Sequence, residues 1–263
     1  MAAERPATAM VLAAGLGKRM RPITDTIPKP LVPIAGKTLL DWGLDSLQEV
    51  GVEKAVVNVH YLPDQIVRHV AARHQPRIVI SDESERLLDS AGGIVKALPE
   101  LGSKPFYIVN ADTFWLDAGK PNLERLALAW DGSGMDILLM LAELPSTTGH
   151  SGGTDFLIAP NGRLSRAKGD PTGLIYAGAA IADPALFKAA AAEPHSLNAY
   201  FDRAIAAGRL SGLVMQGHWI TVGTPDAIAP AEAAVRRAFA DAPRVDISRA
   251  DEPRAGLSRA DEQ

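Results

Sequence analysis

A segment rich in glycine, proline and basic residues is the part of the chain best suited to hold an anion. Gly15 and Gly17 would let backbone N–H groups approach phosphate oxygens, which arginine and lysine side chains could then neutralise. The basic residues of the segment are Lys18, Arg19, Arg21 and Lys29. Its prolines, which stiffen it, are Pro22, Pro28, Pro30 and Pro33. The alternative is a solvated basic loop, but this density of cations and prolines favours a preformed phosphate site. It is neither a Walker A motif nor a dinucleotide fingerprint.

A second residue that could take part in the chemistry is Asp112, in the sequence Asn110-Ala-Asp that follows an apolar run. Mg²⁺ prefers carboxylate and phosphate oxygens, so an aspartate close to a basic phosphate loop is a candidate ligand for it. The alternative is an ordinary loop or helix-capping aspartate.

The elements that must position these residues alternate through the first half. The apolar runs predict strands at 8–13, 55–59, 77–80, 106–109 and 136–142, and helical spacing predicts helices at 40–50, 64–72, 92–98 and 123–130. Repeated β-α units predict a Rossmann-like three-layer α/β/α fold with a mostly parallel sheet. Ligands of such sheets bind beyond the carboxyl ends of the strands, where the loops after Ala13 and Val109 would lie.

The second half is less regular. We expect strands at 154–159, 174–181 and 210–215, a turn at Asn161-Gly162, and helices at 184–192, 197–207 and 225–240. We divide the chain into one domain over 1–243, with a first half over 7–142 and a second half over 143–243. Residues 244–263, which contain a near-duplicated Ser-Arg-Ala-Asp-Glu motif, read as a disordered polar tail.

Composition excludes several classes. The chain has 263 residues, a net charge of −4 and no cysteine, so it has no disulfide scaffold, Cys-ligated zinc or thiol nucleophile. The acidic balance argues against nucleic-acid binding, and no stretch is long enough to span a membrane. Glu4 and the basic residues after the first apolar run argue against a signal peptide, so we expect a cytoplasmic protein. The sequence gives no indication of the oligomeric state.

The glycine-rich loop resembles the signature of the sugar-1-phosphate nucleotidyltransferases: Leu12-Ala-Ala-Gly-x-Gly-x-Arg19-Met, followed by Pro28-Lys29-Pro-Leu. These enzymes join a nucleoside triphosphate to a sugar 1-phosphate and release pyrophosphate. The resemblance covers about residues 8–240 and implies the nucleotidyltransferase fold, with a mixed, mostly parallel central sheet. It also implies that the half over 7–142 binds the nucleotide and the half over 143–243 binds the sugar. The acceptor phosphate is already an oxyanion at neutral pH, so a direct in-line displacement needs no general base.

The resemblance also implies roles for residues of this sequence. Arg19, Lys29 and Asp112 would be catalytic, with Asp112 holding Mg²⁺. The nucleotide would be bound by Leu12, Ala13, Ala14, Gly15, Gly17, Ser90 and Gly92. The sugar would be bound by Asn110, Gly153, Asp155, Lys168 and Gly178. A plain helix start explains the glycines after Ser90 almost as well, and the context of Lys168 is loose.

One position departs from the family pattern. Family members commonly carry Trp-x-Asp-x-Gly-Thr near the end, whose aspartate is a second metal ligand, but here Thr221 takes that place in Trp219-Ile-Thr-Val-Gly-Thr. Either the metal is held more weakly or another acid, such as Asp226, has replaced the ligand.

The choice of substrate is the finer question. The whole set of motifs resembles most the N-acetylmuramate 1-phosphate uridylyltransferases of peptidoglycan recycling, which would make UTP the favoured nucleotide. The alternatives are a mannose-1-phosphate guanylyltransferase or a glucose-1-phosphate thymidylyltransferase. A different class, marked by the missing aspartate, is a catalytically weak sensor of nucleotide sugars.

Overall fold

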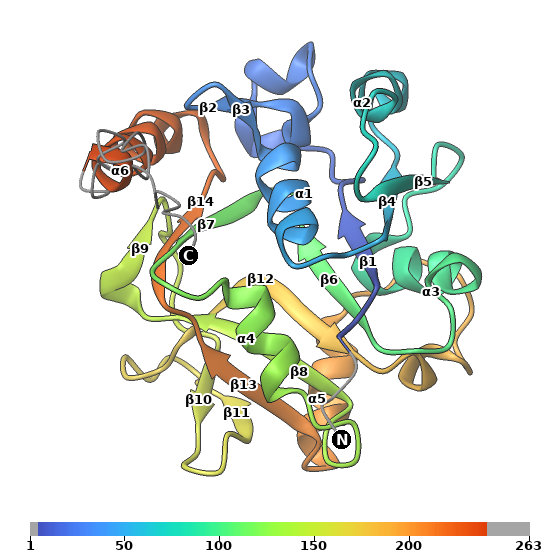
Figure 1. Ribbon diagram of the computed structural model, residues 1–263, viewed down its shortest axis with the longest axis vertical. Coiled ribbons are helices and arrows are strands. Elements are labelled where there is room, and N and C mark those ends of the chain that lie inside the picture. Colours follow the sequence, from blue (N-terminus) through green and yellow to red (C-terminus); the bar gives the residue numbers. More distant parts are fainter. Residues whose placement is uncertain (1–4, 241–263) are drawn as a thin grey trace, which may run out of the picture.

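Seven strands form the central sheet of the computed structural model, which describes residues 5–240 (Figure 1). In spatial order they are β13 (Leu210–Val214), β8 (Ile137–Ala142), β12 (Ile175–Ala182), β6 (Phe106–Asn110), β1 (Thr8–Leu12), β4 (Lys54–Val59) and β5 (Arg77–Asp82). Every neighbouring pair is parallel except the two that β12 makes with β6 and β8. The predicted α/β fold with a mixed, mostly parallel sheet is confirmed.

Helices cover both faces of this sheet because its strands are apolar on both sides. Val11 and Val57 pack with α1 (Leu39–Glu49), α2 (Pro63–Val70) and α4 (Asn122–Ala129). Their neighbours Met10 and Val56 point the other way and pack with α3 (Asp89–Leu101) and α5 (Asn198–Ala206). This period of two along each strand produces the three layers.

A second, smaller sheet was not predicted. It consists of β7 (Thr113–Asp117), β14 (Gly217–Thr221) and β9 (Thr147–Thr148), with β14 in the middle. Its strand β7 begins only three residues after β6 ends, so this sheet continues directly from the edge that carries Asp112.

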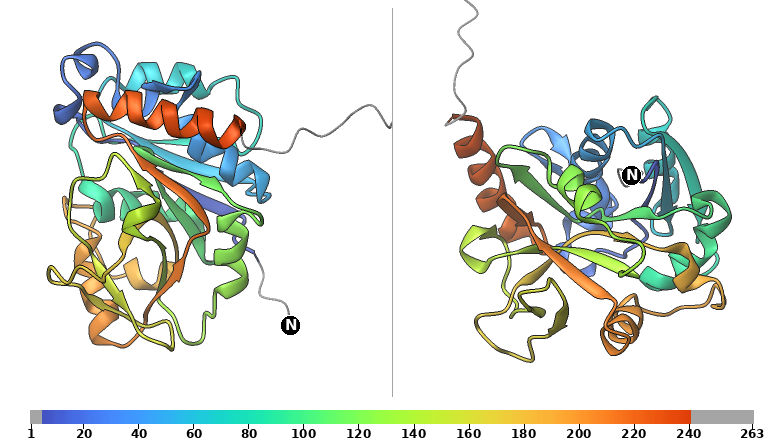
Figure 2. Two further views of the ribbon diagram at one scale, coloured as in Figure 1. Left: turned by 90° about the vertical axis from the view of Figure 1, so that its left-hand side faces the viewer. Right: turned by 60° about the horizontal axis from the view of Figure 1, so that its bottom comes forward.

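The last helix, α6 (Ile228–Ala240), returns to the first third of the chain (Figure 2). Its buried Ala231 and Val235 share a small core with Met20 and Ile34, from the glycine- and proline-rich segment. Two hairpins complete the strands: β2 (Pro33–Ile34) with β3 (Lys37–Thr38), and β10 (Phe156–Ile158) with β11 (Leu164–Arg166). Short 3₁₀ turns lie at Lys18–Met20, Ile23–Asp25, Lys29–Leu31, Leu144–Ser146, Pro184–Phe187 and Pro225–Ala227.

One local prediction was wrong, and one strand was not predicted. The helix expected at 184–192 is a single 3₁₀ turn, Pro184–Phe187, because the chain after it crosses the start of α3 instead of continuing to coil. The Asn161-Gly162 turn joins β10 to the unpredicted strand β11, and β12 follows separately.

Strands from both predicted halves share the central sheet, since β12 and β13 pair with β6 and β8. The predicted polar tail at 244–263 lies outside the described residues. Within residues 5–240, no helix has the length and apolar character that a membrane crossing requires.

Candidate active site

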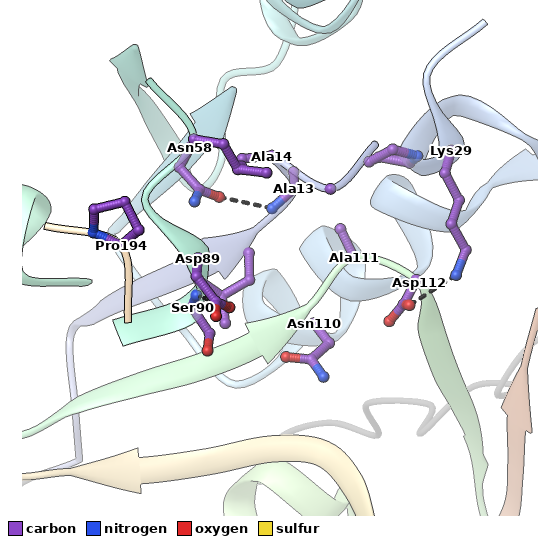
Figure 3. A pocket seen from close by; sticks show the side chains of 14 residues that line it. Ala13, Ala14, Lys29, Asn58, Asp89, Ser90, Asn110, Ala111, Asp112 and Pro194 are labelled. Atoms are coloured by element: carbon purple, nitrogen blue, oxygen red, sulfur yellow. Dashed lines mark hydrogen bonds and ion pairs between the residues drawn. The ribbon is translucent and has the colours of Figure 1, made fainter. Parts of the chain in front are cut away.

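A cavity of about 460 Å³ opens at the carboxyl ends of β1, β4 and β6 (Figure 3). Its walls are Leu12–Gly15 after β1, Asn58 at the end of β4 and Asn110–Asp112 after β6, with Ser90 from the start of α3 facing them. The remaining lining residues are Lys29, Pro30, Leu87, Asp89 and Pro194. The cavity therefore lies where the two polar loops were expected to meet.

A buried polar network fixes one wall of this cavity. Asn58 is 2% exposed, and its Oδ1 accepts a hydrogen bond of 2.7 Å from the backbone N–H of Ala13. Its Nδ2 donates to Oε1 of Glu83, 2.7 Å away, and Oε2 of Glu83 accepts from the N–H of Leu88 at 2.9 Å. The network ties the loop after β1 to the loop before α3, so the cavity is preformed on this side.

The glycine-rich loop is held by close packing around Gly17, which has a positive φ of 61°. A β-carbon there would lie 3.0 Å from the Thr24 side chain and 3.1 Å from Cβ of Lys29. The Thr24 hydroxyl also donates to the Gly17 carbonyl at 2.8 Å. Gly17 thus sets the path of the loop, whereas a β-carbon on Gly15 would meet only open space.

Lys29 and Asp112 form the charged centre of the cavity. The Lys29 ammonium lies 2.7 Å from Oδ2 of Asp112, as the dashed line in Figure 3 shows. The Lys29 side chain is 10% exposed and that of Asp112 is 41% exposed. A largely desolvated cation beside an accessible carboxylate suits the binding of phosphate groups, with or without a metal ion between them.

A second cavity, of about 250 Å³, adjoins the first and shares Leu12, Ser90 and Asn110 with it. Its other lining residues are Asp155, Phe156, Arg166, Tyr176, Leu197, Asn198 and Phe201. Neither Lys29 nor Asp112 lines it, so the two cavities place different chemistry at the two ends of one depression.

Tyr176 lines the second cavity and carries a buried hydroxyl without a hydrogen-bond partner among the described residues. Burial, and then the negative charge of Asp112, raise the pKa of Tyr176 above its ordinary value, so the group stays a protonated donor.

Nine of the fifteen predicted site residues line one or both cavities, and the other six lie elsewhere. Gly92 is packed against the backbone carbonyl of Glu193, which a β-carbon would approach to 2.2 Å, and Gly178 is packed against Thr113 in the same way. Gly153 and Lys168 are exposed and line neither cavity. Arg19 is exposed, with its guanidinium 3.7 Å from where a β-carbon of Gly223 would stand.

Several residues that line the cavities were not predicted from the sequence. Asn58 carried a usable signal, because it is a polar residue inside the apolar strand Ala55–Val59. Arg166 and Asn198 carried none, since only the β10–β11 hairpin and α5 bring them to the second cavity.

The donor set around Asp112 fits a metal that keeps other ligands. Among residues 5–240 there is no cluster of three or more acidic or histidine side chains that could hold a metal by itself. Thr221 pairs with Thr113 in the small sheet, and the next residue, Val222, donates its N–H to the Asp112 carbonyl at 3.3 Å. Thr221 is therefore adjacent to Val222, the residue that faces Asp112 across the two strands. Asp226 is exposed, on the 3₁₀ turn that follows β14.

Comparison with known proteins agrees with this geometry. Residues 9–157, more than half of the chain, match the MobA-like NTP transferase domain. An N-acetylmuramate alpha-1-phosphate uridylyltransferase of Caulobacter vibrioides is 42% identical, over 89% of this chain and 99% of that protein. The enzyme of the same name from Neisseria meningitidis serogroup B is 34% identical, over 82% and 93%.

The fold also occurs in solved structures. The inositol-1-phosphate CTP transferase from T. maritima superposes with a TM-score of 0.72 and 18% identity, covering 89% of this chain and 97% of that one. The family predicted from the glycine-rich loop is thus confirmed by the extent of these matches: the chain belongs to the MobA-like NTP transferase family, as one of its sugar-1-phosphate nucleotidyltransferases.

Proposed function

We propose that the protein joins UTP to N-acetylmuramate 1-phosphate, giving UDP-N-acetylmuramate and pyrophosphate. The observation that carries this proposal is the 42% identity to the C. vibrioides uridylyltransferase, which extends over 99% of that protein. Two adjoining cavities, one beside the phosphate loop and one lined by polar groups, supply room for a nucleotide and a sugar. A role in peptidoglycan recycling, in the cytoplasm, is part of the same proposal.

The reaction requires positioning and charge neutralisation. A phosphate oxygen of the sugar 1-phosphate attacks the α-phosphorus of UTP, and the bond from that phosphorus to the bridging oxygen breaks as pyrophosphate leaves. The Lys29 ammonium would lie against the phosphates in the first cavity, and the loop Leu12–Gly15 would hold the base and ribose. Arg19, at the exposed side of the same loop, would bind the leaving phosphates.

Asp112 would hold Mg²⁺, whose charge offsets the negative charge of the reacting phosphates. One carboxylate suffices because Mg²⁺ readily keeps water and phosphate oxygens as its other ligands. Lys29, bonded to Oδ2, would orient the Asp112 carboxylate. In this arrangement the protein alone holds the metal weakly, and the nucleotide brings most of the ligands.

Thr221→Asp tests that arrangement. A carboxylate there would be added next to the cross-strand neighbour of Asp112, so we expect the Mg²⁺ concentration for half-maximal rate to fall by about tenfold, because added ligand charge tightens cation binding. The measurement is a Mg²⁺ titration of the initial rate, with Asp226→Asn alongside. An unchanged requirement in Thr221→Asp, with a large loss in Asp226→Asn, would show that Asp226 already replaces the missing ligand.

A substrate panel tests the proposed function itself. Pyrophosphate release is measured for UTP, GTP, dTTP and CTP, each combined with the 1-phosphates of N-acetylmuramate, N-acetylglucosamine, mannose and glucose. We expect UTP with N-acetylmuramate 1-phosphate to give the highest kcat/KM, by about tenfold or more over other pairs. A preference for GTP with mannose 1-phosphate, or for dTTP with glucose 1-phosphate, would replace the proposal with one of those activities. Binding without turnover of any pair would indicate a sensor.

A further inference from the structure

We propose that Arg166 is the residue that selects the acceptor sugar, by pairing with the carboxylate of its lactyl group. This inference rests on the proposed function, because N-acetylmuramate differs from N-acetylglucosamine only by the lactyl ether on O3, which carries that carboxylate. Among the residues that line the second cavity, Arg166 is the one cation within the described chain. It is therefore the group able to distinguish an anionic sugar from a neutral one there.

The guanidinium of Arg166 is held in place yet keeps donors to spare. It stacks on Phe156, its partner across the β10–β11 hairpin, with 4.8 Å from Cζ to the ring centroid. Nε donates to Oδ1 of Asp202 at 2.8 Å and Nη2 donates to Oδ1 of Asn198 at 3.0 Å. Nη1 makes no hydrogen bond to any residue that the structure describes. A preoriented guanidinium with a free nitrogen can donate hydrogen bonds to a carboxylate at small entropic cost.

The pair with Asp202 does not use up the charge of Arg166. The Asp202 side chain is 62% exposed while that of Arg166 is 27% exposed. The aspartate is therefore largely hydrated, and its ion pair neutralises little of the charge on Arg166. The acidic group of the cavity itself is Asp155, whose Oδ2 accepts the N–H of Tyr176 at 2.9 Å. Asp155 supplies an acceptor for neutral groups of the sugar, and Arg166 supplies the cation.

Position separates the carboxylate from the other anionic group of the acceptor, its 1-phosphate. The phosphate must reach the α-phosphorus of the nucleotide, beside Lys29 and Asp112, and these residues line the first cavity alone. Arg166 lines the second cavity alone. With the phosphate at the Lys29 end, the lactyl group on the far side of the sugar ring is the anion left for Arg166.

The test compares two acceptors and two forms of one acceptor. In Arg166→Met, we expect kcat/KM for N-acetylmuramate 1-phosphate to fall about 30-fold or more, while kcat/KM for N-acetylglucosamine 1-phosphate changes by less than about threefold. Wild type should lose a similar factor on the methyl ester of the lactyl carboxylate, and Arg166→Met should not distinguish ester from acid. Arg166→Lys, which keeps the charge without the fork, should fall between the two.

Activity with N-acetylglucosamine 1-phosphate reports folded enzyme in each variant, and Arg203→Met, an exposed arginine on α5 outside both cavities, is the matched control. Equal losses on both acceptors would assign Arg166 to the shared phosphate or to the fold, and no loss on either would remove it from recognition. Either result overturns the inference. If wild type does not use N-acetylmuramate 1-phosphate at all, the proposed function fails instead.

Discussion

Replacing Asp112 with asparagine is expected to lower kcat by about 10³-fold or more. Asparagine has nearly the same shape and can still accept the hydrogen bond that Lys29 donates to Oδ2, so the change removes charge and little else. Since no cluster of acidic or histidine side chains within residues 5–240 stands ready to hold a cation in its place, the proposed Mg²⁺ would lose its protein ligand. The measurement is the single-turnover rate at saturating UTP and acceptor, over a range of Mg²⁺ concentrations.

The same substitution made elsewhere is the control. Asp131→Asn alters an exposed aspartate that holds Ser133 in a turn, and we expect it to change kcat by less than about twofold. Asp112→Asn also leaves the ammonium of Lys29 without its anionic partner, so rates should be compared well below the unfolding temperature of each variant. A folded Asp112→Asn enzyme with a normal rate at ordinary Mg²⁺ would remove Asp112 from the mechanism.

The central sheet was readable from the sequence because its strands are buried on both faces. Such strands are continuous apolar runs, and β1, β4 and β6 were predicted within one residue at either end. The small sheet was missed for the opposite reason. Strand β7 pairs with β14, which lies about one hundred residues further along the chain, and pairing over that separation leaves no local pattern. Ala-rich residues after Phe187 suggested a helix, but they lie against α3, where Glu193 packs on Gly92.

The site divides in the same way. The end that we propose binds phosphate has a local signal, because its loop concentrates glycines, prolines and cations in one stretch. The structure brings Lys29 and Asp112 together at the edge of the sheet where both loops were expected. The second cavity was identified only in part: the family resemblance pointed to Asn110 and Asp155, but Arg166 and Asn198 were missed because they come from separate elements, β11 and α5. Each of these two has an ordinary local context, and only the packing of β11 and α5 brings them to one cavity.

Lys29→Met is the second substitution with a large expected effect, a loss in kcat of about 10²- to 10³-fold. Methionine fills most of the space of the lysine stem, which is 10% exposed and packs at Cβ against Gly17, so the loop should keep its path. What disappears is one ammonium group, fixed by Asp112 and by the prolines on either side of it before any substrate binds. A charge that is fixed before the reaction stabilises the transition state without the cost of reorganising during the reaction. The loss of this stabilisation lowers kcat.

The comparison that separates this role from simple phosphate binding uses kcat and KM together. If Lys29 only attracted the nucleotide, Lys29→Met would raise the KM for UTP and saturating UTP would restore the rate. We expect kcat to stay low at saturation, and Lys29→Arg to rescue little, because the wider guanidinium cannot take the place of an ammonium that lies 2.7 Å from Asp112 in a largely buried side chain. Lys188→Met, at an exposed lysine far along the chain and outside both cavities, should leave kcat and KM within about twofold of wild type. Full recovery of the Lys29→Met rate at high UTP would reassign Lys29 from the chemical step to ground-state binding.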